Sequence, residues 1–126
     1  MMRAAAAWQL LIPMALPVLL LGAGGSGRPP LVDAAKRGDR DAVRALVQQG
    51  ASVNAADEDG TTALHWASYR DDVRSADLLI RAGARVNAPN DLGVTPLWTA
   101  SQNGSAAMVR RLLDEGANPN AALLLG

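Results

Sequence analysis

The residues best suited to chemistry in this sequence surround its only histidine. His65 is followed three positions later by Ser68 and then by Asp71 and Asp72. An imidazole that takes the proton of a serine hydroxyl while a carboxylate orients the ring is the arrangement of serine hydrolases. Because the sequence offers no oxyanion-hole element beside these residues, a hydrolase that uses His65 is a remote alternative to a structural role for this histidine.

The acidic segment DEDG at residues 57–60 is the candidate for a metal site. Carboxylates are natural ligands of Ca²⁺, but this segment lacks the alternating spacing and the distal glutamate of a calcium loop. Ordinary turn chemistry accounts better for its aspartates and its glycine. We therefore expect no metal site, no cofactor and no catalytic residue.

Composition excludes further classes of function. Twelve basic and twelve acidic residues give a formal net charge of zero, so there is no basic footprint for nucleic acid. The absence of cysteine excludes disulfides, thiolate metal sites and thiol catalysis. A length of 126 residues leaves room for one small domain and a leader. The excess of arginine over lysine and the abundance of alanine are typical of a GC-rich bacterial genome.

Residues 1–28 have the composition of a secretory signal peptide with a glycine-rich end. A single arginine precedes an apolar stretch over residues 8–21, and small residues follow over 22–27. The alternative is an anchor in the inner membrane, but the stretch is shorter than the roughly 20 residues of a span and contains Pro13 and Pro17. We expect cleavage in the small-residue region and a periplasmic or secreted location in a bacterium, with membrane attachment only if the leader is retained.

The elements that must position any site are indicated by an internal repeat over residues 29–126. A shift of 33 residues aligns TALHWA at 62–67 with TPLWTA at 95–100 without a gap. Self-similarity at this period indicates a solenoid of stacked units. The same register aligns one helical leucine and four loop positions in three copies: Leu46, Leu79 and Leu112; Gly50, Gly83 and Gly116; Ala51, Ala84 and Ala117; Asn54, Asn87 and Asn120; Gly60, Gly93 and Gly126.

Each unit is predicted to contain two helices. The first starts after a capping threonine, Thr62 or Thr95, and ends near Tyr69 or Gln102. Apolar residues at helical spacing then predict a second helix, which ends at a glycine in the left-handed conformation. Turn-forming Asp, Asn and Gly residues lead to the next threonine. The second helices are expected to begin after Gly38, Asp71 and Gly104.

This pattern resembles the ankyrin repeat, whose signature T-P-L-H-x-A corresponds to TALHWA. The resemblance implies an all-α solenoid of about three helix-turn-helix units of 33 residues with short hairpin-like loops, at about 29–57, 58–90 and 91–126. It also implies that His65 bonds back to the Thr62 hydroxyl or nearby backbone. Trp98 replaces this histidine in the third unit. Asp71 replaces a left-handed glycine, a conformation that aspartate tolerates at a cost of roughly 1 kcal/mol.

The resemblance implies a non-catalytic protein–protein interaction module that displays hairpin tips and inner helices to a partner. A periplasmic accessory or stabilising subunit for one enzyme is the alternative. Tyr69 and Arg70 are the most anchor-like of the displayed residues, because Tyr and Arg are enriched at binding hot spots. By the family pattern the candidate partner-binding residues are Lys36, Arg37, Glu58, Asp59, Thr61, Tyr69, Arg70, Asp91, Leu92, Val94, Gln102 and Asn103.

The last residues, NAALLLG, fall within the same frame. Gly126 aligns with Gly60 and Gly93, which each precede another threonine motif or its equivalent. We therefore expect the chain to be an N-terminal fragment of a longer array. A terminal unit without a polar outer face is expected to expose apolar surface and to self-associate end to end.

Overall fold

The computed structural model describes residues 27–121, which contain six α-helices. The first 26 residues, which include nearly all of the predicted leader, and residues 122–126, which include Gly126, lie outside the described part. The helices are α2 (Pro30–Arg37), α3 (Arg40–Gln48), α4 (Ala63–Tyr69), α5 (Val73–Arg81), α6 (Pro96–Gln102) and α7 (Ala106–Asp114).

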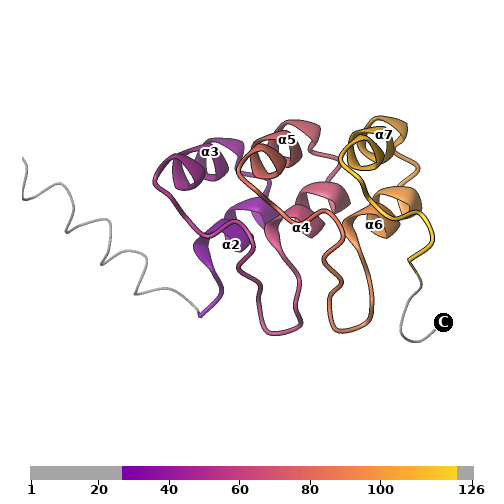
Figure 1. Ribbon diagram of the computed structural model, residues 1–126. Coiled ribbons are helices and arrows are strands. Elements are labelled where there is room, and N and C mark those ends of the chain that lie inside the picture. Colours follow the sequence, from indigo (N-terminus) through magenta and orange to yellow (C-terminus); the bar gives the residue numbers. More distant parts are fainter. Residues whose placement is uncertain (1–26, 122–126) are drawn as a thin grey trace, which may run out of the picture.

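The helices form three antiparallel pairs that lie side by side, so that α2, α4 and α6 make one row and α3, α5 and α7 make another (Figure 1). Contacts join the two helices of each pair and the neighbours within each row. In residues 27–121 the chain forms no strand, and the first hairpin has a single antiparallel bridge between Ala56 and Thr62. The prediction of an all-α solenoid is confirmed.

The helix starts follow from local capping. The Thr95 hydroxyl accepts the Trp98 N–H at 3.2 Å, as expected for a capping threonine. The second helices have caps that the sequence analysis did not name: Asp39, Asp72 and Ser105 accept backbone N–H groups at 3.0, 3.2 and 3.2 Å. Each such cap stabilises a helix by about 1 kcal/mol, so all three pairs begin their second helix at a defined residue.

Left-handed residues end the second helices, as predicted. Gly50, Gly83 and Gly116 have φ angles of 85°, 102° and 93°.

Asp71, between α4 and α5, has a φ of 56° and is the only non-glycine residue with positive φ in the described part of the chain. Its carboxylate accepts a hydrogen bond from the hydroxyl of Ser105 in the next repeat. The departure from glycine therefore provides a contact between repeats.

Equivalent asparagines link successive repeats. Asn54 donates to the Gly83 carbonyl at 3.1 Å and accepts the Arg85 N–H at 2.8 Å. Asn87 makes the same pair of bonds one repeat later, to the Gly116 carbonyl at 3.1 Å and from the Asn118 N–H at 2.6 Å. Because each side chain satisfies backbone groups left free beyond a helix end, the 33-residue recurrence of asparagine has a structural cause.

Stacking decides which apolar residues are buried. Leu79 and Leu112, at equivalent positions on the second helices, are both fully buried. Ile80 is 9% exposed beneath the third repeat, whereas the equivalent Leu113 is 42% exposed on the last described helix.

Among residues 27–121, no helix is long and apolar enough to cross a membrane.

Candidate binding surface

Two hairpins project beyond the row formed by α2, α4 and α6 (Figure 1). The Asp57 N–H donates to the Thr61 carbonyl at 3.0 Å in the first hairpin, and the Asn90 N–H donates to the Val94 carbonyl at 2.9 Å in the second. The tips are joined because the Asp91 N–H donates to the Asp59 carbonyl at 2.9 Å. We refer to the hairpin tips (57–60 and 90–93) together with the exposed side of α2, α4 and α6 as the inner surface.

His65 connects the start of α4 to the second hairpin. Its Nδ1 accepts the Thr62 N–H at 3.0 Å and lies 2.8 Å from the Thr62 hydroxyl. Its Nε2 lies 2.8 Å from the Val94 carbonyl. A backbone N–H can only donate, so Nδ1 is the acceptor and Nε2 carries the proton that it donates to Val94. The expected bond to Thr62 is confirmed, and the bond to the next repeat is an additional finding.

The surroundings of His65 do not assemble a hydrolase triad. The side chain is 3% exposed, and burial lowers its pKa below the ordinary value near 6.5, so the ring is neutral at pH 7. Both ring nitrogens are occupied by Thr62 and Val94, and the buried Ser68 hydroxyl has no hydrogen-bond partner among the described residues. Asp72 instead bonds to the Ser75 hydroxyl at 2.7 Å. Within residues 27–121, no serine is therefore placed for activation by this imidazole.

The acidic hairpin is organised around one backbone donor. The Thr61 N–H donates to the carboxylates of Asp57 and Asp59, at 3.2 and 3.0 Å. The pKa of Asp59 is lowered to about 2 because its carboxylate shares a hydrogen bond with Asp57 and accepts hydrogen bonds from Thr61. Burial, with the neighbouring Asp59 charge, raises the pKa of Asp57. At neutral pH the negative charge of Asp59 is thus firmly retained.

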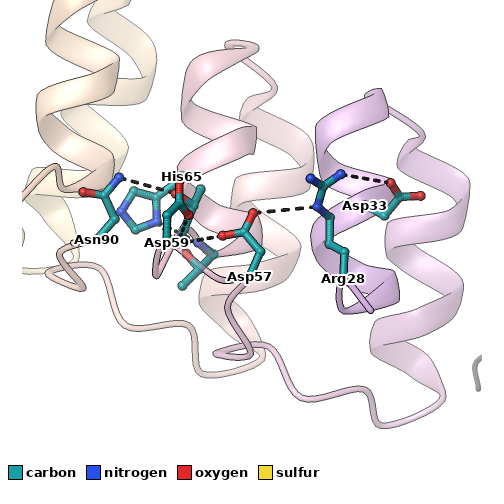
Figure 2. Close-up of polar contacts among 8 residues, drawn as sticks. Arg28, Asp33, Asp57, Asp59, His65 and Asn90 are labelled. Carbon is teal, nitrogen blue, oxygen red and sulfur yellow. Dashed lines mark hydrogen bonds and ion pairs between the residues drawn. The ribbon is translucent and has the colours of Figure 1, made fainter. Parts of the chain in front are cut away.

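Arg28, which precedes the first helix, contacts the side of this hairpin (Figure 2). Its guanidinium lies 3.7 Å from a carboxylate oxygen of Asp33 and 3.8 Å from one of Asp57. In residues 27–121, no group of three or more His, Cys, Asp or Glu side chains is arranged to hold a metal ion.

An aromatic hollow of about 330 Å³ opens where the two hairpins meet α4 and α6. The Trp66 and Tyr69 rings pack edge to face, with centroids 5.6 Å apart and an interplanar angle of 84°. Tyr69 is 59% exposed, whereas Trp66 is partly buried. The hollow is lined by Asp59, Thr61, His65, Trp66, Tyr69, Asn90, Val94 and Thr99.

The structure places the predicted partner-binding residues on the hairpins and at the C-terminal ends of the inner helices. Lys36 and Val94 are partly buried, and Thr61 is buried at 9% exposure. The exposed members are Arg37, Glu58, Asp59, Tyr69, Arg70, Asp91, Leu92, Gln102 and Asn103. Their roles in binding stay predictions.

Three of these residues, Thr61, Arg70 and Asn103, also form hydrogen bonds to a neighbouring repeat. The Thr61 hydroxyl lies 3.4 Å from the Asn90 amide nitrogen. Asn103 donates to the carbonyls of Ser68 and Tyr69 at 3.1 and 2.7 Å, and Arg70 donates to the Lys36 carbonyl at 3.1 Å. The reason is that residues about one repeat apart face each other across the stack, so that these side chains reach a side chain or a backbone carbonyl of the neighbouring repeat.

Trp66 lines the hollow but was not among the predicted partner-binding residues. The sequence did contain an indication of this, since Trp66 occupies the variable position of the TALHWA motif, directly after His65. Asn90 and Thr99 carried no such signal. They join the hollow because the third repeat stacks on the second.

Stacked antiparallel helix pairs, linked by hairpins that bond to each other and to the inner helices, define an α-helical repeat solenoid with one displayed surface. The chain belongs to the ankyrin-repeat family: the family described as Ankyrin repeats (3 copies) matches residues 31–122 and, in an overlapping match, residues 3–90. A comparison with curated proteins gave no match. Ankyrin repeats are generally protein–protein interaction modules and are typically non-enzymatic scaffolds.

Proposed function

We propose that this chain is a non-catalytic protein-binding module that recognises its partner through the inner surface. The observation that carries the proposal is the position of Tyr69, which is 59% exposed, packs on Trp66 and borders the aromatic hollow. Tyr and Trp are among the residues most enriched at hot spots of protein interfaces.

Rigidity supports the same proposal. The hairpin tips are bonded to each other through Asp91 and Asp59, and His65 holds the second hairpin to α4. A surface that is ordered before it meets its partner loses little conformational entropy on binding. The inner surface can therefore contribute more of its contact energy to affinity than a set of free loops.

The composition of residues 1–28 supports a periplasmic or secreted location in a bacterium as part of the proposal. Cell fractionation of the full chain, followed by N-terminal sequencing, tests it. A mature N-terminus between about residues 23 and 28, in the periplasmic or extracellular fraction, is the expected result. An intact leader in the membrane fraction would show an anchored protein instead.

Site-specific photo-crosslinking tests the binding surface. A photoreactive phenylalanine at Tyr69 is expected to capture a protein partner in the cell, because this position is on the inner surface. The matched control is the same group at Arg110, which is exposed on α7 in the other row of helices. Equal adducts at both positions, or none at Tyr69, would refute the proposal. One enzyme captured in stoichiometric amount would define an accessory subunit.

A further inference from the structure

The aromatic hollow has the chemistry of a site for a cationic side chain. Two aromatic rings, Trp66 and Tyr69, form part of its wall, and the Asp59 carboxylate lies at its hairpin edge. The residues that line it include no lysine or arginine, and His65 is neutral because burial lowers its pKa. A cation in the hollow would therefore meet aromatic side chains and a carboxylate, and no residue of the wall would carry a competing positive charge.

The chain itself shows that Trp66 attracts a cation. The Lys36 ammonium lies 5.2 Å from the centroid of the Trp66 ring, within the range of a cation–π contact. Lys36 comes from α2, on one side of α4, whereas the hollow is lined by residues of the second and third repeats, towards α6 (Figure 1). Lys36 is thus not among the residues that line the hollow.

The hollow has one carboxylate in its wall, and two more lie on the hairpin tips. Asp59 lines the hollow. Glu58 lines the neighbouring hollow, which it shares with Arg28, and Asp91 is exposed on the second tip. Arg28 lies 3.8 Å from Asp57 and 3.7 Å from Asp33. The carboxylates of the tips together raise the local concentration of cationic groups and favour their docking.

We propose that this hollow binds one arginine or lysine side chain of the partner protein, with the cation over the Tyr69 and Trp66 rings and in hydrogen-bonding reach of Asp59. The inference rests on the proposed function, because it names the chemistry of the partner at the same surface. A volume of about 330 Å³ is at the lower end of ligand pockets, which fits one long side chain. Arginine is favoured, since its planar guanidinium both stacks on rings and bonds a carboxylate in two places.

An NMR titration of the full chain tests the proposal. The probes are the peptide acetyl-Gly-Gly-Arg-Gly-Gly-amide and its citrulline counterpart, which has nearly the same shape without the charge. The indole N–H signal of Trp66 reports on the hollow, and that of Trp98, which does not line it, is the internal reference. We expect saturable movement of the Trp66 signal alone, with about tenfold weaker binding of the citrulline peptide.

Two substitutions sharpen the test. Asp59→Asn keeps an oxygen that accepts the Thr61 N–H and is expected to weaken the arginine peptide about tenfold. Asp41→Asn removes the same charge from a side chain that is 93% exposed on α3 and should leave binding unchanged. Equal binding of both peptides, equal effects of both substitutions, or an immobile Trp66 signal would overturn the inference. If crosslinking through Tyr69 persists in that event, the proposed function stands; if it is lost as well, both fail.

Discussion

Replacement of His65 by alanine should lower the free energy of unfolding by about 3 to 4 kcal/mol. The imidazole joins Thr62, at the start of α4, to Val94 in the next repeat through contacts of 2.8 to 3.0 Å. Each of these hydrogen bonds contributes about 1 kcal/mol, and a buried group left without a partner costs about 1 to 3 kcal/mol. The ring is 3% exposed, so its loss also leaves a cavity.

This loss is large for a domain of this size, because native domains are stable by only about 5 to 15 kcal/mol. Urea unfolding followed by tryptophan fluorescence and far-UV circular dichroism measures it. Gln102→Ala, at an exposed position on α6, is the control and should change stability by less than about 0.5 kcal/mol. A loss below about 1 kcal/mol for His65→Ala would refute the role assigned to these hydrogen bonds.

A double-mutant cycle isolates the polar contact from the cavity. Thr62→Val removes the hydroxyl that lies 2.8 Å from Nδ1 with little change in shape. If this contact stabilises the fold, the two substitutions together should cost about 1 kcal/mol less than the sum of their separate effects. Strict additivity would show that His65 acts only by filling space.

Three further predictions concern the rest of the scaffold. Burial lowers the pKa of His65, so the unfolded chain binds the proton more readily than the folded chain. The free energy of unfolding should therefore fall as the pH decreases from 7.5 through 6.5. Urea unfolding curves at pH 7.5 and 5.5 measure this dependence, which should be absent in His65→Ala. Gly60→Ala should lower the free energy of unfolding by about 2 to 3 kcal/mol in thermal unfolding, because φ is 82° and the added Cβ would lie 3.2 Å from the second hairpin. Gly50→Ala is the control: its φ is 85° but the space around it is open, so the loss should be about 1 kcal/mol. Asn87→Ala should cost about 2 kcal/mol and increase hydrogen exchange at Asn118, since it removes both bonds to the loop beyond α7; an unchanged exchange rate would contradict this bridging role.

Local features were predictable because their cause lies within a few residues. A threonine before a helix, a glycine after one and an aspartate at Asp71 each meet a backbone requirement of their own segment, and the observed caps and φ angles agree. The repeat of 33 residues also predicted that successive helix pairs stack in chain order, because units that recur at a fixed spacing bury their apolar faces against one another.

Contacts between repeats were not accessible in this way. Thr61 and Asn103 were candidate partner-binding residues by the family pattern, and the structure shows in addition that Thr61 is buried beside Asn90 and that Asn103 bonds to carbonyls of the preceding repeat. Such contacts join residues 29 to 35 positions apart and depend on the rotation between neighbouring units.

By itself, the sequence indicated a repeat solenoid and its helix boundaries, since these depend on periodicity and local capping, and the resemblance of its motif to the ankyrin repeat implied which residues are candidates for binding. Only the tertiary structure decided that His65 reaches Val94, that Trp66 and Tyr69 form a wall, and that Asp59 stands beside it. The physical reason is that a hollow lies between units, so its shape and charge arise from the stack and from no single repeat.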